Sequence, residues 1–521
     1  MGKPKGPNQK AKYKALNARL DRYTLLVKKI YDTYNLEAAK IATSVNYDGE
    51  KPFSFADYPT TKKRVQDLLN GWKNDMFAVI NKGTASEWAN SNAVQDLLAD
   101  KALWYYYGRE HGRRKRKYYQ TNPDSLVAFQ TRVDKGMNLS QKIWEQSKGY
   151  KEDLESALSS GIQKGMSAVT LSKRVSKYLV DFDSLRADYK EKYGKETDAL
   201  NCEYRSMRLA RSEINMAYRS AEQLRWKQFD FVKAKEIKLS KSHHDRMPGG
   251  DICDDLAGIY PKEIDWTGWH PNDMCYVVPV LKTEEEFFSD EEVPNEQIEF
   301  PSGFDNWVNK NIDRLSGALD RNTLPYWIRD NKDVKDCIRT ICNAREVGDT
   351  LQGYAEAIAE KYGCSVTPIN YKKFSSLYRK LTNPIDPTPI GDIKDAVRNT
   401  IVAPKEAISS VIDELKKVDG FIRHKPQSTD FGYTGNIINV RFPNGVIGEI
   451  QVNTPQMIYA KDSPSSAKRV IGEELWNKIH NETGLEGGLG HKFYEQGRVT
   501  IDTKKLDEII RKSKEYYKHF S

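Results

Sequence analysis

The stretch "GVIGEIQVNT", residues 445–454, predicts a β-strand because apolar and polar side chains alternate along it. One side carries Val446, Gly448, Ile450 and Val452. The other side aligns Glu449, Gln451 and Asn453, a carboxylate and two amides. A solvent-facing strand more often mixes in Lys, Thr or Ser, so this face is either plain surface or a binding surface.

Length and composition predict several domains. The chain has 521 residues, which exceeds one ordinary core and suggests three or four folding units of about 100 to 200 residues. Hydrophobic residues make up 38% and charged residues 30%, and the mean hydropathy is −0.72. Aromatic residues, at 11%, are sufficient to build cores, so we expect a very polar but folded protein.

The chain shows no run of about 18 apolar residues, and its lysine-rich start lacks an apolar signal-peptide core. We therefore expect no membrane insertion and no classical secretion, and a place in the cytosol or inside a particle. The six cysteines are unevenly spaced and do not form a disulfide framework, which agrees with a reducing compartment.

The net charge of +9 is concentrated locally. The stretch "WYYYGREHGRRKRKYYQ", residues 104–120, places basic side chains between aromatic ones. Its basic run is Arg113, Arg114, Lys115, Arg116 and Lys117. Two interpretations stay open: a solvated helix end whose tyrosines pack on a neighbour, or a contact with nucleic acid or an acidic protein surface.

The predicted secondary structure changes along the chain. Residues 10–230 predict helices, most clearly at 204–229, where apolar residues recur three and four apart. Strands are predicted at 232–240 and 275–281, followed by an acidic, proline-containing linker. After residue 331, helices and strands alternate, which predicts an α+β domain with a mixed sheet and helices on one face.

The irregular loop before residue 275 contains candidate metal ligands. Cys253, His270 and Cys275 are predicted to meet in space, and His243 or His244 is close enough in sequence to supply a fourth ligand. The spacing is not a regular zinc signature. Folding of a long loop through hydrogen bonds and packing is an equally good interpretation.

The helix before this loop and the loop itself resemble the phage Mu F-like minor head protein family, also called the phage head morphogenesis domain. The resemblance rests on the triplet Arg211, Ser212 and Glu213, on Cys253 with Gly258, and on "WHPNDMCYVVPV", residues 269–280. It implies a virion protein bound near the portal inside a tailed-phage head, with portal and capsid proteins and packaged DNA as partners, which then acts in the virion or the host cytoplasm.

The second half of the chain contains a constellation suited to phosphates. Lys372, Ser376 and Lys380 recur every four residues, so on a helix they would present two cations around a hydroxyl. A solvated lysine face is the plain alternative. Asp395 and Arg398 precede and enter an apolar strand.

Two further features complete this constellation. Tyr433 follows Gly432 in a turn where we expect an exposed ring able to stack on a base, and Glu449 and Gln451 follow on the quoted strand. Carboxylates, lysines, an arginine and a stacking tyrosine suit metal-assisted phosphoryl transfer to a nucleotide.

In this order the motifs resemble the synthetase domain of the RelA/SpoT alarmone synthetase family, a branch of the nucleotidyltransferase-like folds. The family's "KxxxSxxxK" fits Lys372, Ser376 and Lys380, and its "DxxGxR" is approximated by Asp395 and Arg398. Its "GY" loop fits Gly432 and Tyr433, its "EIQ.RT" fits Glu449, Gln451 and Thr454, and its "H..YK" resembles His491 with Phe493 and Tyr494.

The resemblance implies transfer of pyrophosphate from ATP to a ribose 3′ hydroxyl of GDP, GTP, an adenine nucleotide or a tRNA end. Asp395 and Glu449 would hold Mg²⁺, and Glu449 would help to deprotonate the acceptor. Lys372, Lys380 and Arg398 would bind the phosphates, and Tyr433 would stack on the acceptor base. Ser376, Gln451 and His491 would complete the substrate site.

Two alternatives remain for this domain. It is either an inactive binding module that keeps the fold, or a nuclease or RNA-binding module that uses His424, His480 and His491. The predicted architecture is multidomain: a mainly α-helical amino-terminal half with a small α+β head-morphogenesis domain, then an α+β nucleotidyltransferase-like domain. The expected boundaries are 1–148 (basic, helical), 149–282 (Mu F-like), 283–330 (acidic linker), 331–500 (RelA/SpoT-like) and 501–521 (helical tail).

Overall fold

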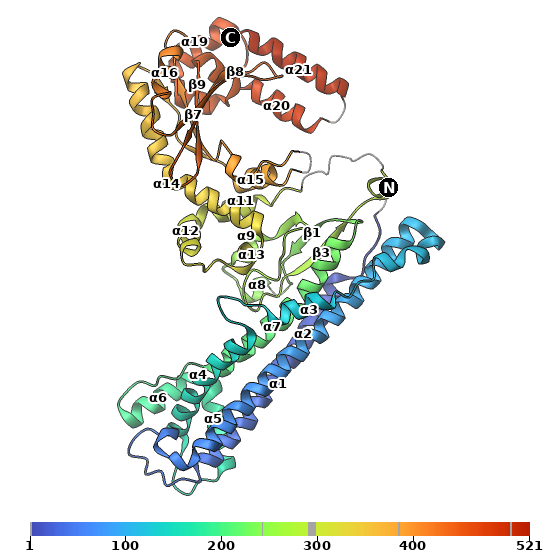
Figure 1. Cartoon of the computed structure of the whole chain (residues 1–521), viewed down its shortest axis with the longest axis vertical. Helices are drawn as coiled ribbons and strands as arrows, with labels where there is room; N and C mark the ends of the chain where they lie inside the picture. The colour runs from blue at the N-terminus through green and yellow to red at the C-terminus, as the bar shows by residue number, and fades with distance from the viewer. Residues whose placement is uncertain (1–2, 242, 290–297, 384–385, 501–502, 521) are drawn as a thin grey trace. The chain divides into compact units, whose positions relative to one another are not determined.

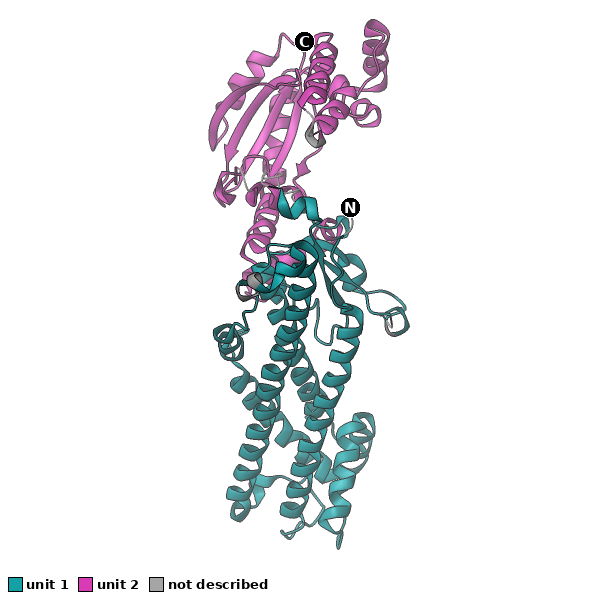
Figure 2. Ribbon diagram, turned by 90° about the vertical axis from the view of Figure 1, so that its right-hand side faces the viewer, with its two compact units in different colours: residues 1–303, 325–330 teal, residues 304–324, 331–521 magenta. Residues whose placement is uncertain are grey.

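The computed structural model describes residues 3–241, 243–289, 298–383, 386–500 and 503–520, without the side chains of residues 113–116, 246, 498 and 499. The chain forms two compact units, coloured separately in Figure 2. Unit 1 comprises residues 1–303 and 325–330, and unit 2 comprises residues 304–324 and 331–521. The predicted multidomain organisation is thereby confirmed.

Long helices form most of unit 1, as the pattern over residues 10–230 predicts. The longest are α1 (Gln9–Ala42), α2 (Lys62–Tyr107), α4 (Leu139–Gly161), α5 (Ala168–Val180) and α7 (Cys202–Gln228). The amide of Ala11 donates to the side chain of Asn8 at the start of α1, and Asn138 forms a capping box with Gln141 at the start of α4. Figure 1 shows α1, α2 and α7 side by side.

Shorter elements connect these helices. They are η1 (Phe55–Asp57), η2 (Pro59–Thr61), η3 (Gly108–Lys117), α3 (Pro123–Thr131), α6 (Phe182–Tyr193), α8 (His243–Arg246) and α9 (Ile252–Leu256). The expected domain boundary between residues 148 and 149 falls inside α4, because that helix runs without interruption from residue 139 to 161. Among the helices in the described ranges, none is both long enough and apolar enough to cross a membrane.

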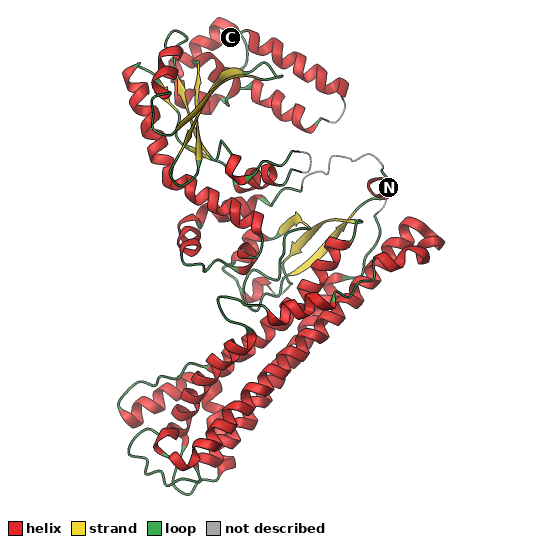
Figure 3. Cartoon of the chain, viewed as in Figure 1, coloured by secondary structure: helices red, strands yellow, loops and turns green. Residues whose placement is uncertain are grey.

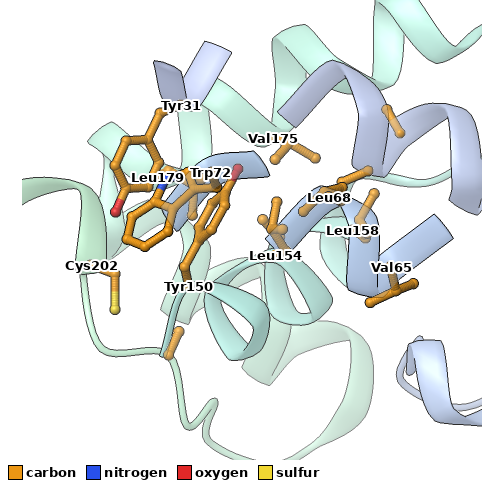
Figure 4. Packing of buried hydrophobic residues seen from close by; sticks show 14 of the residues in the cluster. Tyr31, Val65, Leu68, Trp72, Tyr150, Leu154, Leu158, Val175, Leu179 and Cys202 are labelled. Atoms are coloured by element: carbon orange, nitrogen blue, oxygen red, sulfur yellow. The ribbon is translucent and has the colours of Figure 1, made fainter. Parts of the chain in front are cut away.

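An aromatic cluster holds the bundle of unit 1 together (Figure 4). The rings of Tyr31 and Tyr150 lie 4.7 Å apart between centroids, and those of Tyr31 and Trp72 lie 5.6 Å apart, both edge to face. The hydroxyl of Tyr31 bonds Ser206 at 2.8 Å, and that of Tyr150 donates to Asn35 at 2.8 Å. Helices α1, α2, α4 and α7 therefore share one core, in which the tyrosine hydroxyls are hydrogen-bonded.

A buried carboxyl group lies among α1, α2 and α7. The Tyr13 hydroxyl donates to Glu222 at 2.6 Å, and the Gln95 amide donates to it at 3.3 Å. Burial raises the pKa of Glu222 to about 8, although its hydrogen bonds and the charge of Arg219 oppose the increase. At a pH between the ordinary pKa of a glutamate and about 8, Glu222 is therefore protonated in the folded chain and ionised in the unfolded chain.

We expect Glu222→Gln to stabilise unit 1 increasingly as the pH rises from 5 to 8. The unfolded carboxyl loses its proton near its ordinary pKa, whereas the folded one keeps it up to about 8, so wild-type stability is present at low pH and is lost across this window. The difference in unfolding free energy should reach about 2 to 4 kcal/mol at pH 8. Urea unfolding at both pH values measures it.

The exposed Glu145→Gln, on α4, is the control for removing a negative charge from unit 1. It should show no such pH dependence. A difference between Glu222→Gln and wild type that stays constant from pH 5 to 8 would contradict the proton-binding explanation.

The small sheet of unit 1 has the order β2-β1-β3, with both pairings antiparallel. β1 (Val232–Lys238) and β3 (Tyr276–Leu281) confirm the two predicted strands. β2 (Gly258–Pro261) was not predicted, because four residues inside a Gly- and Asp-rich loop give no alternation to read.

The segment expected as an acidic linker is largely helical. It contains α10 (Glu284–Phe288), α11 (Ser302–Lys310), α12 (Ile312–Asp320) and α13 (Tyr326–Arg329), while residues 290–297 lie outside the described residues. The Trp327 indole donates to the carbonyl of Trp269 at 3.2 Å, and Phe304 packs on Phe374 with centroids 4.7 Å apart. Buried aromatic side chains, rather than the acidic composition, decide the structure here.

Unit 2 is built on a six-stranded sheet of order β4-β6-β9-β8-β7, with β5 paired to β6. β6 and β9 are parallel and the other pairs are antiparallel, which confirms the mixed sheet. The strands are β4 (Ser365–Val366), β5 (Asn370–Tyr371), β6 (Val397–Val402), β7 (Phe421–Ser428), β8 (Thr434–Arg441) and β9 (Ile447–Asn453).

Helices pack against this sheet (Figure 3). α14 (Lys332–Lys361) and α16 (Ile408–Leu415) contact it. The Asn399 amide of β6 donates to Gln352 of α14 at 2.9 Å, and a Cβ at Gly448 would lie 3.0 Å from Leu351. The remaining elements are α15 (Phe374–Leu381), η4 (Ile390–Asp392), α17 (Pro455–Lys461), α18 (Pro464–Ile471), α19 (Glu473–Thr483), α20 (Leu489–Val499) and α21 (Thr503–Lys518).

Candidate active site

The opening stretch forms β9, and its polar side chains share one face of the sheet. In the pairing register Glu449 stands opposite Arg398 of the parallel strand β6 and opposite Asn439 of the antiparallel strand β8. The Gln451 amide donates to Glu449 at 2.6 Å. The face is not plain surface, because Glu449 and Gln451 are each only 8% exposed.

Asp395 lies just before β6 and forms ion pairs with two lysine ammonium groups. Lys372 Nζ lies 2.5 Å from its Oδ2, and Lys380 Nζ lies 3.0 Å from Oδ1 and 2.9 Å from Oδ2. The predicted association of these residues is present, but not on a single helical face. Residues 370–371 pair with β6, and the Lys372 amide donates to the Ala396 carbonyl at 2.9 Å, so the helix begins only at Phe374.

Lys372 and Lys380 contact Asp395, whereas Ser376, the third residue of the motif, is not hydrogen-bonded to it within the described part of the chain. Its neighbour Ser375 bonds Asp305 instead, through its amide at 2.9 Å and its hydroxyl at 2.7 Å. That contact anchors the start of α15 to α11. Ser376 itself is half-buried on α15.

Burial and charge separate the two carboxyl groups. Although burial opposes it, the charges of Lys372 and Lys380 hold the pKa of Asp395 below its ordinary value. Burial raises the pKa of Glu449, the bond from Gln451 opposes this, and the charge of Asp395 adds to it. Burial also lowers the pKa of Lys372, against the attraction of Asp395. Two carboxyl groups with opposite shifts are typical of sites that move protons and bind cations.

Tyr433 is buried, so the expectation of an exposed ring is wrong. Its hydroxyl accepts from the Asn453 amide at 2.5 Å, and its ring packs edge to face on Tyr517 of α21, with centroids 5.9 Å apart. A Cβ at Gly432, where φ is +88°, would lie 2.9 Å from Lys514 of the same helix. The tail that covers the tyrosine is remote in sequence, and for this reason the local pattern did not reveal the burial.

Lys461 belongs to this cluster, and the sequence motifs did not identify it. It ends α17, and its Nζ lies 3.5 Å from Gln451 Oε1 and 5.1 Å from the centroid of the Tyr433 ring. Burial lowers its pKa, while Asp462 and Glu449 favour its charged form and Arg398 opposes it. A half-buried lysine beside Arg398, held by one long hydrogen bond, is suited to receive an anion.

The histidines proposed for nuclease chemistry lie on three different elements. His424 on β7 contacts Asn436 at 2.9 Å, His480 on α19 contacts the Tyr459 hydroxyl at 2.9 Å, and His491 is exposed on α20. No contact recorded among the described side chains joins one of these imidazoles to another or to Glu449. The arrangement therefore favours the carboxylate site over histidine chemistry.

The residues of the expected metal site lie close together, whereas the expected basic contact surface is described only in part. Cys253 and His270 come together, with Sγ and Nε2 3.2 Å apart, and Cys275 lies close to Cys253. In the basic run, Lys117 pairs with Asp230 at 2.9 Å. The side chains of Arg113, Arg114, Lys115 and Arg116 lie outside the described residues.

The mixed sheet of unit 2 carries two carboxyl groups, lysines and an arginine beside its parallel strand pair. This combination of groups is the chemistry of a phosphoryl-transfer domain. No family model matches the chain. It is 34% identical over 172 residues to the (p)ppApp synthetase toxin Tas1 of Pseudomonas aeruginosa (strain UCBPP-PA14). The match covers 32% of this chain and 38% of Tas1, so the chain spans well under half of that relative.

A solved structure is also similar, the crystal structure of the complex between the Type VI effector Tas1 and its immunity protein. That comparison has 29% identity and a TM-score of 0.31, and it covers 36% of this chain and 96% of the other. The sequence similarity to Tas1 agrees with the alarmone-synthetase resemblance. It provides no support for the Mu F-like resemblance of the amino-terminal half.

Proposed function

We propose that unit 2 is a pyrophosphokinase that transfers the β,γ-pyrophosphoryl group of ATP to the 3′ hydroxyl of a nucleotide. The observation that carries this proposal is the cluster around Asp395 and Glu449, where ordered motifs remote in sequence converge on adjacent strands. The similarity to a synthetase named for (p)ppApp supports it and favours an adenine nucleotide as acceptor.

The reaction is an exchange of one phosphorus–oxygen bond for another. The acceptor 3′ oxygen forms a bond to the β-phosphorus of ATP, the bond from that phosphorus to the α–β bridging oxygen breaks, and AMP leaves. Lys372, Lys380 and Arg398 would bind the phosphates and offset the charge that develops during transfer. Glu449 would accept the proton of the acceptor hydroxyl, and its raised pKa strengthens it as a base.

The donor set of the site also fits a magnesium ion. Asp395 lies just before β6, and Arg398 of that strand stands opposite Glu449 in the register, so the two carboxyl groups lie on neighbouring segments of the chain. One or two carboxylates together with substrate phosphates are the usual ligands of Mg²⁺. Bound Mg²⁺ would supply positive charge on the pyrophosphoryl oxygens, and the lysines on Asp395 would then be free to contact phosphate.

A panel of acceptors tests this proposal. The full chain is incubated with ATP, Mg²⁺ and, in turn, an adenine nucleotide, GDP, GTP or tRNA, and products are identified by mass spectrometry. We expect an adenosine 3′-pyrophosphate product together with AMP. A guanine or tRNA product would correct the acceptor, whereas a folded protein that binds ATP and forms no product would favour the inactive-module alternative.

We expect Lys461→Met to lower the rate of transfer about 10-fold or more. Methionine keeps the length of the side chain but removes the positive charge near Gln451. Because burial already lowers the pKa of Lys461, the substitution should not destabilise the fold. Steady-state kinetics with varied ATP measures the effect, and the exposed Lys478→Met is the matched control. Wild-type kinetics in Lys461→Met would exclude the residue from the site.

For residues 149–282 we also propose the Mu F-like role, a minor head protein associated with the portal. Its support is the order of elements: α7 with Arg211 and Glu213, then β1, the loop of Cys253, and β3. Purified particles from a producing strain, analysed by quantitative mass spectrometry, test it. Co-purification of the chain with portal and capsid proteins is expected, and its absence from intact particles would refute the role.

A further inference from the structure

The loop between β1 and β3 of unit 1 brings thiols and imidazoles together. The candidate ligand atoms of His243, Cys253 and Cys275 all lie within 4.8 Å of one another, and so do those of Asp251, Cys253 and His270. Cys253 belongs to both groups, which makes it the centre of the cluster. Its Sγ lies 3.2 Å from Nε2 of His270.

The two groups overlap at Cys253, and their separations fit the spacing of ligands around one ion. Zinc lies at about 2.3 Å from sulfur and about 2.0 to 2.1 Å from nitrogen, so tetrahedral ligand atoms are separated by about 3.5 Å. The distance from Cys253 to His270 is close to this value. Cys253, Cys275 and His243 are each 3% exposed or less, as expected of a structural site, and the His270 side chain, 37% exposed, lies at its edge.

The surrounding groups orient the imidazoles. His270 Nδ1 lies 2.9 Å from the Pro271 carbonyl, which only accepts hydrogen bonds. The proton of a neutral His270 is therefore on Nδ1, and the lone pair of Nε2 is directed toward Cys253. An Asp254 oxygen lies 2.9 Å from Nε2 of His243, and an Asp251 oxygen lies 3.3 Å from Nε2 of His270. Asp254 on Nε2 of His243 leaves Nδ1 of that ring for a metal, which is the supporting role of a carboxylate beside a metal-binding histidine. Asp251 instead faces the same Nε2 of His270 that faces Cys253, and it is itself a candidate ligand.

The rest of the loop is held by groups that are not candidate ligands. The buried Arg219 of α7 donates to the carbonyls of Asp273 at 3.0 Å and Cys275 at 2.6 Å. The Asp273 carboxylate accepts from the amides of Trp269 and Cys275, each at 2.7 Å. Asp273 is thus committed to the backbone, and Cys275 is fixed in place beside Cys253.

We propose that this loop binds one zinc ion through Cys253, Cys275, His243 and His270, as a structural site that closes unit 1. Two thiolates and two imidazoles select a borderline-soft ion such as zinc over Mg²⁺ or Ca²⁺. The site is independent of the proposed reaction, because its residues belong to unit 1 and the reaction is assigned to unit 2.

The metal content of the full chain tests this site. Protein purified from zinc-supplemented medium without chelators should contain about one zinc per chain by inductively coupled plasma mass spectrometry. The double variant Cys253→Ser with Cys275→Ser should contain none, and His243→Gln should lose most of it. His244→Gln is the matched control, since this neighbouring side chain is 75% exposed, and it should keep the zinc.

Two further measurements keep the result decisive if a variant fails to fold. Co²⁺ added to wild-type protein from which zinc has been removed should give a thiolate-to-cobalt absorption band of tetrahedral intensity. Thiol titration of the denatured wild type should find all six cysteines reduced. Zinc-free wild type without the cobalt band, zinc retained by the double variant, or two thiols missing in a Cys253–Cys275 disulfide would each overturn the proposal.

Discussion

Glu449→Gln should lower pyrophosphate transfer by about 100-fold or more while leaving unit 2 folded. The amide keeps the size of the side chain but cannot accept the proton of the acceptor hydroxyl, a contribution of about 10² to 10⁴ in rate. It is also a poorer ligand for a magnesium–nucleotide complex. Label transfer from γ-³²P-ATP, followed at saturating and limiting acceptor, measures the loss.

Stability should not explain this loss. Glu449 is buried, and burial raises its pKa, so a neutral amide removes an unfavourable charge rather than a favourable one. The unfolding midpoint in urea should therefore match or exceed that of wild type. Glu482→Gln, an exposed position on α19, is the control for charge removal in the same unit. Full activity in Glu449→Gln would remove this residue from the mechanism.

Asp395→Asn should impair both activity and stability. Lys372 and Lys380 would lose their shared counter-charge, and removing one partner of a partly buried ion pair costs on the order of 1 to 3 kcal/mol. Transfer should fall about 100-fold, because a carboxylate ligand is lost and the two lysines are misplaced. Kinetics and urea unfolding on the same preparation separate the two effects.

The stability effect of Asp395 should depend on pH in a defined direction. Its pKa is lowered in the folded chain, so its contribution is present above the ordinary pKa of an aspartate and is lost as the pH falls through the folded pKa. The difference between Asp395→Asn and wild type should therefore shrink in acid. Asp392→Asn, an exposed neighbour in η4, should show neither effect. A constant difference across pH would contradict the ion-pair explanation.

The strands of unit 2 could be predicted from the sequence because their alternation is strong. In β9 the polar and apolar positions fall on opposite faces, and the register with β6 then places Arg398 beside Glu449. Asp395 and Lys380 were predicted as members of one site from the order of their motifs. The spacing of Lys372, Ser376 and Lys380 predicts one helical face, and this prediction is wrong because a short pairing with β6 precedes the helix.

Contacts between segments remote in sequence could not be predicted. Nothing local to Tyr433 indicates that α21 packs on it, and nothing local to Lys461 indicates that β9 lies beside it. In unit 1, Cys253, His270 and Cys275 were predicted as a group. The choice of His243 rather than His244 depends on the way the loop folds, which leaves the first buried and the second exposed.

Transfer of pyrophosphate by unit 2 is measured by incubating the full chain with γ-³²P-ATP, Mg²⁺ and an adenine nucleotide. We expect label on the adenine nucleotide, one AMP released per label transferred, and loss of both in Glu449→Gln. Folded protein that binds ATP but transfers no label to an adenine nucleotide, a guanine nucleotide or tRNA would contradict the proposed transfer.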